Sequence, residues 1–482
     1  MFQETIRDAG LNKYLFEMAN IRDQNTWVHM NDPDKATQKA KDLVRMAVAK
    51  ASLVEPLRQV ALEIKKSLLV VGGGVAGMEA ALCAASQRVE VHLVEKTGVL
   101  GGVARDLNAT WKGENIPDYL EGLIAKTLVS DDIQLYLNSE IESFTGSMGN
   151  FVTTVKNNET GKQIVIEHGA AVLATGGKEY KPHEYLYGDH PDVLTHLDMD
   201  AALREKDPRI EAAKSVVFIQ CVGSRNEQNP YCSKVCCTHS LKSAIALKEM
   251  NRRKKVYVIY RDLRSYGFRE DLYQTARGLG ILFIRYDLEK MPVLRENANK
   301  DLELSVIDHI LQMPVTLHPD LVVLASGVVP GNNKNLFEKL KVPTNAEGFL
   351  VEAHAKLRPV DFASDGLFVA GLAHYPKPVE ESIAQARAAV ARAMTILSRD
   401  SLMVGGVVAR VTPEKCAVCL TCVRTCPYGI PYINADGYAQ IDASECHGCG
   451  ACVAECPGKA IRLDHFTDQQ IMAKTDALFE DA

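Results

Sequence analysis

Two cysteine runs near the C-terminal end carry the clearest chemistry in this 482-residue chain. They read Cys416-x2-Cys419-x2-Cys422-x3-Cys426-Pro427 and Cys446-x2-Cys449-x2-Cys452-x3-Cys456-Pro457. In runs of this spacing, three thiolates wrap one face of a 4Fe-4S cluster, and the fourth binds the other cluster. Structural zinc sites are the alternative, but zinc does not require two copies of a run ending in Cys-Pro. The predicted ligands are Cys416, Cys419, Cys422 and Cys456 for one cluster, and Cys446, Cys449, Cys452 and Cys426 for the second.

Four further cysteines lie within 17 residues of one another, at Cys221, Cys232, Cys236 and Cys237. Four thiolates are enough for one more 4Fe-4S cluster. The spacing alone leaves a zinc site, a disulfide or simple buried thiols open. The remaining cysteine, Cys83, stands in an apolar stretch and is predicted to be a small buried hydrophobic residue.

A glycine-rich loop, Gly72-x-Gly74-x-x-Gly77, follows the apolar run SLLVV and opens a predicted helix. The first glycine permits the tight turn, the second lets a pyrophosphate approach the backbone, and the third lets helix and strand pack closely. Glu95 ends the next predicted strand, where a carboxylate binds ribose hydroxyls. A plain tight turn is the alternative, but the strand–loop–helix context favours a dinucleotide site.

Two later stretches resemble flavoproteins with two dinucleotide-binding domains, such as thioredoxin reductase. They are Leu173-Ala174-Thr175-Gly176-Gly177 and the segment from Asp365 to Gly371, and Gly98, Gly101 and Gly102 after Glu95-Lys96 add to the likeness. The resemblance implies FAD, and a helix starting near Pro378 that points its N-terminus at the flavin. Leu372 stands where that family usually has an acidic residue. The implied cofactor-binding residues are Gly72, Gly74, Val75, Ala76, Gly77, Glu95, Lys96, Gly101, Gly102, Ala174, Thr175, Gly176 and Gly371.

The elements around these residues alternate between strands and helices. A second strand-rich unit opens at residues 215–220 and closes at 321–327, but no GxGxxG follows its first strand, so we do not expect NAD(P) there. The predicted fold class is α/β: two Rossmann-like, thioredoxin-reductase-like dinucleotide-binding modules plus a C-terminal α+β two-cluster ferredoxin domain. The predicted domains are a helical attachment segment (1–66), the FAD-binding domain (67–204 and 331–400), the second Rossmann-like domain with the cysteine-rich motif (205–330), the ferredoxin domain (401–465) and a C-terminal tail (466–482).

The two ends of the chain are predicted to be mainly helical. Residues 1–66 carry few strand signals, and residues 34–66 show the pattern of one or two amphipathic helices with a break at Pro56. The tail from His465 onward is predicted to form a helix or an ordered strap.

The net charge of -6 and the absence of a Lys/Arg tract argue against nucleic acid as a partner. No apolar run approaches the roughly 18 residues of a membrane span, and the opening residues do not resemble a signal peptide. We therefore expect a soluble, cytoplasmic protein with reduced cysteines.

Most of the chain also resembles HdrA, an oxidoreductase component of the heterodisulfide reductases of anaerobic metabolism. The likeness is carried by QCVGSRNEQNPYCSKVCCTHSLKSAIALKE, VYVIYRDLRSYGFREDLY, FIRYD and, near the start, GLNKYLFEMANIRDQNTWVHMNDPDKATQKAKDLVRMAVAKA. In that family the central cysteines hold a 4Fe-4S cluster beside FAD. The resemblance therefore implies one FAD and three 4Fe-4S clusters, the third held by Cys221, Cys232, Cys236 and Cys237.

The resemblance also implies partners: subunits with the disulfide-reducing site, an electron-donating hydrogenase, formate dehydrogenase or NADH-oxidising module, ferredoxin, and a second copy of this chain within the complex. Family members from methanogens are longer at the N-terminus, and some carry an inserted ferredoxin unit. Residues 101–170 contain no cysteine here. One electron exit is therefore expected to be missing or supplied by another subunit.

Three functional hypotheses follow. The first is an electron-bifurcating subunit, because flavin accepts an electron pair and each cluster passes one electron. The second is an NAD(P)H-dependent flavoprotein oxidoreductase that feeds its own ferredoxin domain, and the third is a non-bifurcating conduit. Lys242, five residues after Cys237, is the candidate catalytic cation near the flavin; a solvated lysine on a helix face is the alternative.

Overall fold

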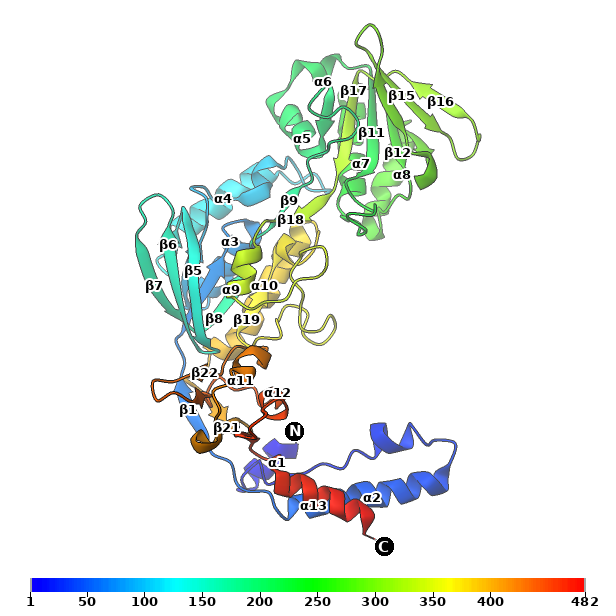
Figure 1. The fold of residues 1–482 in the computed structure, drawn as a ribbon. Coiled ribbons are helices and arrows are strands. Elements are labelled where there is room, and N and C mark those ends of the chain that lie inside the picture. The colour runs from blue at the N-terminus through cyan, green and yellow to red at the C-terminus, as the bar shows by residue number, and fades with distance from the viewer. Residues whose placement is uncertain (1, 481–482) are drawn as a thin grey trace. The chain divides into compact units, whose positions relative to one another are not determined.

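The computed structural model describes residues 2–480 and divides into two compact units (Figure 1). One unit combines the residues up to Glu63 with those from Asp400 onward. The other is formed by Ile64–Arg399. Each unit contains its own cysteine-rich region, so the two are described separately.

The larger unit begins with a five-stranded parallel sheet in the order β19-β8-β2-β3-β4. Its central strand β2 is buried along its whole length, which explains the unbroken apolar run SLLVV. Helices α3 and α10 pack against each other beside this sheet. The elements are β2 (Ser67–Val71), α3 (Val75–Ala85), β3 (Glu90–Val94), η2 (Gly102–Asp106), α4 (Ile116–Leu128), β4 (Ile133–Tyr136), β8 (Ala170–Leu173), β19 (Leu367–Val369), η5 (Gly371–Ala373) and α10 (Val379–Leu397).

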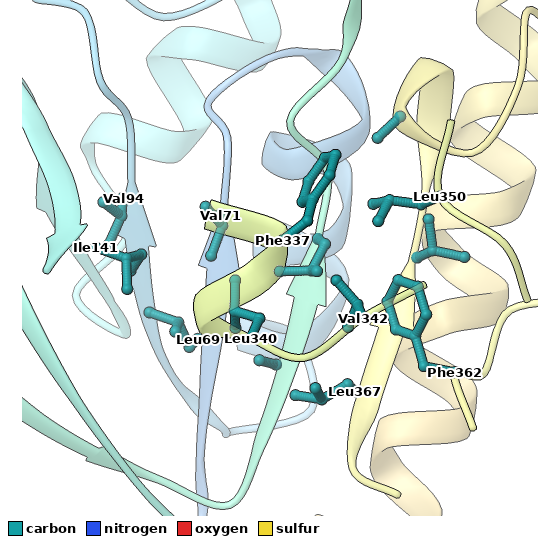
Figure 2. Close-up of a cluster of buried hydrophobic side chains, with 14 of the residues drawn as sticks. Leu69, Val71, Val94, Ile141, Phe337, Leu340, Val342, Leu350, Phe362 and Leu367 are labelled. Atoms are coloured by element: carbon teal, nitrogen blue, oxygen red, sulfur yellow. The ribbon is translucent and has the colours of Figure 1, made fainter. Parts of the chain in front are cut away.

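A three-stranded antiparallel sheet, β5-β6-β7, packs next to the parallel sheet through a shared core. Figure 2 shows this core, where Leu69 and Val71 of β2 meet Ile141 of β5 and Phe337 and Leu340 of the α9 region. The core therefore holds the strand that leads into the glycine loop. The elements are β5 (Ser139–Ser147), β6 (Asn150–Asn157), β7 (Gln163–His168) and α9 (Lys334–Lys339).

The second module of this unit has its own parallel sheet in the order β10-β17-β11-β12-β13. The antiparallel strands β9 and β18 join it to the first module (Figure 1). Two parallel sheets with crossover helices confirm the two Rossmann-like modules. The elements are β9 (Gly177–Glu179), β10 (Val193–Thr195), α5 (His196–Glu205), α6 (Pro208–Ala212), β11 (Ser215–Val222), α7 (Cys236–Met250), β12 (Lys255–Tyr260), η3 (Gly267–Arg269), α8 (Glu270–Gly278), β13 (Leu282–Arg285), η4 (Leu288–Lys290), β14 (Val293–Glu296), β15 (Leu302–Ile307), β16 (Pro314–Leu317), β17 (Leu321–Ser326) and β18 (Val328–Pro330).

The smaller unit is built from short strand pairs, short helices and two longer helices that lie side by side, α2 and α13 (Figure 1). The side chain of Arg45 on α2 donates to the carbonyl oxygen of Ala477 on α13 over 2.7 Å. The elements are α1 (Phe2–Asp8), η1 (Arg22–Thr26), α2 (Pro33–Ala51), β1 (Gln59–Glu63), β20 (Ser401–Gly405), β21 (Ala409–Val411), η6 (Pro413–Lys415), α11 (Thr421–Thr425), β22 (Tyr432–Ile433), β23 (Ala439–Gln440), α12 (Ala451–Ala454), β24 (Ile461–Leu463) and α13 (Asp468–Phe479).

One local prediction for this unit was wrong and one is confirmed. The predicted amphipathic helix ends at Ala51, and the segment after Pro56 forms strand β1, which pairs antiparallel with β20. Its partner lies more than 300 positions away, so no local pattern revealed the pairing. The predicted helical tail is α13, which begins at a capping box in which Thr467 and Gln470 bond to each other's backbone.

Within residues 2–480, the helices are too short or too polar to cross a bilayer.

Candidate redox sites

The glycine loop has the close backbone contacts that a dinucleotide site needs. Gly72 has a φ of 110°, and a Cβ there would lie 2.3 Å from the carbonyl oxygen of Ala174. A Cβ on Gly77 would lie 1.8 Å from the carbonyl oxygen of Gly72. A Cβ on Gly74, in contrast, would point into open space, the approach path that a pyrophosphate takes to the helix N-terminus.

The segment after Glu95 returns to this loop. The backbone N–H of Gly101 donates to the carbonyl oxygen of Gly73 over 2.8 Å, and Gly101 pairs with Gly74 as an isolated bridge. The Glu95 carboxylate accepts from the N–H of Gly73 over 2.6 Å and from the N–H of Thr97 over 2.8 Å. The predicted ribose-binding carboxylate therefore lies directly at the phosphate loop.

A pocket opens beside this carboxylate, where the adenosine half of a dinucleotide is predicted to bind. The hydroxyl of Thr175 is buried at this pocket and has no hydrogen-bond partner within the described residues. A buried hydroxyl without a partner is costly, so a ligand that hydrogen-bonds to it would stabilise the site. The lining includes Gly72, Glu95, Lys96, Ser139, Thr175 and Asn333.

The closing segment of the predicted flavin site is held from both sides. Gly371, with a φ of 72°, donates its N–H to the side-chain oxygen of Gln385 over 3.0 Å. Its carbonyl oxygen accepts from the ammonium of Lys377 over 2.6 Å. Helix α10 begins directly after Pro378, as predicted. Lys377 and Gln385 were missed by sequence reasoning, and a lysine just before this helix was the available signal.

The four central cysteines come from three elements that meet at one end of the second parallel sheet. Cys221 lies near the end of β11 with a φ of 63°, Cys232 lies in the following loop, and Cys236 and Cys237 open α7. Burial, together with the nearby thiols of Cys221 and Cys232, raises the pKa of Cys237 to about 12. Burial and the three neighbouring thiols likewise raise the pKa of Cys236. The structure therefore brings all four thiols together.

One cation and one backbone N–H group contact these thiols. The guanidinium of Arg225 lies 3.9 Å from the Sγ of Cys221 and donates to the Asp262 carboxylate over 2.6 Å. The backbone N–H of Lys234 donates to the Sγ of Cys232 over 3.4 Å. Cations and N–H donors favour the thiolate form, which is the form that binds iron.

Lys242 is engaged within the protein. Its ammonium donates to the carbonyl oxygen of Ala109 over 2.8 Å and lies 3.6 Å from the fully buried Asp200 carboxylate. Burial lowers the pKa of Lys242, and Asp200 opposes that shift. Asp200 also accepts from the N–H of Asn108 over 3.0 Å and lies 3.0 Å from His239. Lys242 thus ties α7 to the loop after η2, and its predicted role towards the flavin stays a prediction.

In the smaller unit, the eight C-terminal cysteines surround two cavities. Backbone N–H groups donate to the sulfurs of Cys416, Cys446 and Cys456 over 3.3–3.4 Å. Within residues 2–480, no three His, Cys, Asp or Glu side chains converge on a position for one metal ion. A 4Fe-4S cluster needs a ring of thiolates instead, because each thiolate binds a different iron. Cys416, Cys419, Cys422 and Cys456 line one cavity, and Cys426, Cys446, Cys449 and Cys452 line the other.

Comparison with known proteins agrees with this arrangement. Residues 66–219 match the pyridine nucleotide-disulphide oxidoreductase family, and residues 409–457 match the 4Fe-4S dicluster domain family. The HdrA component of the H(2):CoB-CoM heterodisulfide,ferredoxin reductase of Methanothermobacter thermautotrophicus is 32% identical, over 99% of this chain and 86% of that protein. An HdrA-type iron-sulfur component of the CoB--CoM heterodisulfide reductase of Methanopyrus kandleri is 33% identical, over 90% of this chain and 80% of that protein.

Among solved structures, a thioredoxin reductase of T. acidophilum aligns with 69% of this chain and 97% of its own, with 16% identity and a TM-score of 0.48.

The modules and cysteine-lined cavities define an iron–sulfur flavoprotein oxidoreductase of α/β fold. More specifically, the chain belongs to the HdrA family of heterodisulfide reductases, because relatives aligned over nearly its whole length share about a third of its residues. The predicted family and fold class are thereby confirmed. Electron transfer through flavin and 4Fe-4S clusters is the general role that follows.

Proposed function

We propose that this chain divides electron pairs into single electrons within a heterodisulfide-reductase-type complex. The observation that supports this most is the position of the central cysteines. They gather where strand β11 of the second module ends, the place a nicotinamide-binding glycine loop would occupy. A 4Fe-4S cluster at that position would carry one electron at a time, whereas a nicotinamide would exchange an electron pair.

The proposed cofactors are FAD and three 4Fe-4S clusters. When bound, the flavin can take up an electron pair and give it up singly, while each cluster carries one electron. The proposed ligands of the third cluster are Cys221, Cys232, Cys236 and Cys237. The ligands of the other two are the two crossed sets that line the cavities of the smaller unit.

The chain's own residues supply binding and electrostatics. Gly74 leaves space for the pyrophosphate, and Glu95 and Thr175 provide groups for the adenosine half. Arg225 places a positive charge beside Cys221, which favours the reduced, more negative state of a cluster there. Cys236 and Cys237 are buried, whereas Cys221 and Cys232 are partly exposed. We propose Lys242 as a cation that acts on the flavin from the loop it holds at Ala109.

Relatives suggest the partners. The Methanothermobacter protein is named for H(2), a CoB-CoM heterodisulfide and ferredoxin. We propose that this chain works with ferredoxin, with disulfide-reducing subunits and with an electron-donating hydrogenase, formate dehydrogenase or NADH-oxidising module, and pairs with a second copy of itself. The alignment spans 571 positions, more than this chain has, so that relative contains insertions. In this chain, a partner subunit would supply the electron exit that an inserted ferredoxin unit provides in some relatives.

The test begins with anaerobically purified chain. We expect bound FAD and about a dozen irons. Far fewer irons, or no flavin, would contradict the cofactor set. NADH or NADPH should not bleach the flavin of the isolated chain; rapid bleaching would favour the NAD(P)H-dependent oxidoreductase instead.

The intact complex then tests the splitting of electron pairs. We expect the donor to reduce ferredoxin only while a second acceptor, such as a disulfide, is reduced at the same time. Ferredoxin reduction that proceeds equally well without the second acceptor would show a simple conduit.

A further inference from the structure

Two lysines from different parts of the larger unit meet at Tyr375. The ammonium of Lys377 donates to the carbonyl oxygens of Gly371 and Tyr375 over 2.6 and 2.7 Å. The ammonium of Lys234 lies over the ring of Tyr375, 5.2 Å from its centre. Tyr375 therefore contacts two ammonium groups: that of Lys377 through its carbonyl oxygen, and that of Lys234 through its aromatic ring.

The charge of Lys377 is poorly compensated. Within residues 2–480, no carboxylate oxygen forms an ion pair with its ammonium, which contacts only neutral carbonyl groups. Burial and the like charge of Lys234 lower the pKa of Lys377 to about 7, and the more distant Glu381 and Glu352 only partly oppose this. A partly buried cation without an anion is unfavourable, and such groups gather at sites where a negative charge binds or develops.

The position of Lys377 points to bound FAD as the source of this negative charge. The glycine that it holds, Gly371, approaches the first turn of α3: a Cβ on Gly371 would lie 2.8 Å from the Cβ of Ala76. That turn follows the phosphate loop directly. Helix α10, which is 19 residues long, starts two residues after Lys377, so its positive N-terminal end adds to the same field.

Gly371, whose carbonyl oxygen contacts Lys377, is also held on its N–H side. Gln385 connects the N–H of Gly371 to the Nδ1 of His374, over 3.0 and 2.8 Å. The Nε2 of His374 in turn lies 2.7 Å from the Glu352 carboxylate. Gly371 is thus held on its N–H side by this chain of side chains and on its carbonyl side by Lys377.

Lys234 connects the same positive region to the central cysteines. It lies between Cys232 and Cys236 in the sequence, and its N–H donates to the Sγ of Cys232. The Cys232 thiol also acts electrostatically on Tyr375, whose pKa burial and nearby negative groups raise. The lysine pair therefore lies between the closing segment of the flavin site and the central cysteines.

We propose that Lys377 and Lys234 form a single shared cationic site that couples the two redox centres. Lys377 would act on bound FAD from the segment it holds at Gly371, and Lys234 would act on the central cluster from its place beside Cys232; both would favour the negative charge that each centre gains on reduction. Because Lys234 acts electrostatically on Lys377 and both contact Tyr375, each would also act, more weakly, on the other centre. This inference rests on the proposed function, since it requires both FAD and the central cluster.

The test measures midpoint potentials by anaerobic redox titration of the full chain, following the flavin by absorbance and the clusters by EPR. The variants are Lys377→Gln, Lys234→Gln and the charge-conserving Lys377→Arg. Lys162→Gln is the matched control, because it removes a lysine charge from the exposed turn between β6 and β7. Iron and FAD contents of every variant show whether it folds and loads normally.

We expect K377Q to weaken binding of reduced relative to oxidised FAD by about 10- to 100-fold, seen as a more negative flavin potential. K234Q should shift the central cluster more than the flavin, K377R should restore most of the flavin shift, and K162Q should change neither. Normally loaded K377Q with an unchanged flavin potential would overturn the inference and leave the proposed function standing. Wild-type chain without FAD or without the central cluster would overturn both.

Discussion

The two cysteine regions of this protein are built in opposite ways. In the smaller unit, eight cysteines lie in two short runs, and each cavity takes three cysteines from one run and the fourth from the other. In the larger unit, four cysteines are brought together by the end of a buried strand, a loop and the start of a helix. The first arrangement is encoded in local spacing, whereas the second depends on a folded module around it.

The cores beneath the two regions differ in the same way. The buried core around the C-terminal cysteines contains only six residues, and two of them are Cys422 and Cys452. The central cysteines belong to a module with extensive aliphatic cores on both faces of its sheet. Metal should therefore contribute far more to the stability of the first region than to that of the second.

The largest expected effect follows from removing iron with a chelator under anaerobic, reducing conditions. Residues 409–463 should lose most of their hydrogen-exchange protection, because their small core includes the ligands themselves. The strands β11, β12 and β17 should keep theirs, since their core is aliphatic. Hydrogen exchange with peptide-level mass spectrometry measures both. Equal loss of protection in the two regions would remove the contrast drawn here.

Single cysteine substitutions should each remove one cluster, about four of about twelve irons. Cys456→Ser should abolish the cluster at Cys416, Cys419 and Cys422, although it lies in the other run, and Cys236→Ser should remove only the central cluster. Iron analysis with EPR distinguishes the three signals. Cys83→Ser is the control, since this cysteine lies outside all three groups and should leave the iron content unchanged. A C456S variant that lost the cluster of its own run would disprove the crossed arrangement.

Gly74→Ala should lower the affinity for FAD at least tenfold while the chain stays folded, because the new methyl group points into open space that the pyrophosphate needs. The matched control is Gly122→Ala on α4, where a Cβ also meets nothing within 4 Å. Flavin fluorescence during titration of FAD into flavin-free protein gives the affinity. The C-terminal clusters should load normally in G74A; if they do not, the two regions depend on each other more than we propose.

The smallest expected effect concerns the pH dependence of the larger unit. Burial lowers the pKa of His168 to about 3, and its ring hydrogen-bonds to the Thr153 hydroxyl and the carbonyl oxygen of Ala170. The unfolded chain binds a proton near pH 6.5 that the folded chain does not, so stability should fall as the pH drops from 7 towards 5.

His168→Gln keeps a polar group in place without this proton, so its stability should fall less over the same range. Urea unfolding followed by far-UV circular dichroism measures the difference between pH 7 and pH 5. The control is His183→Gln, an exposed histidine of the same unit. Parallel pH curves for wild type and H168Q would contradict the assignment to His168.

Much of the architecture could be predicted from local patterns. The apolar run at Ser67–Val71, the glycine loop and the following helix specify one another, because a buried parallel strand, a tight turn and a helix N-terminus each need particular residues. Strand β1 could not be predicted, since Gln59–Glu63 is mostly exposed and its pairing partner is β20. Lys377 was missed because its position just before α10 does not by itself reveal that its ammonium contacts the carbonyl oxygens of Gly371 and Tyr375.

By itself, the sequence determined which residues could bind iron and nucleotide, because cysteine spacing and glycine positions are set over a few bonds of chain. Only the tertiary structure decided what else surrounds them: that the four central cysteines gather at one end of a sheet, and that Lys242 is held by Ala109 and Asp200. It also decided that Lys234 and Lys377 meet at one tyrosine. The physical reason is that charges and ligands act through space, over distances that a folded chain can make short between residues far apart in sequence.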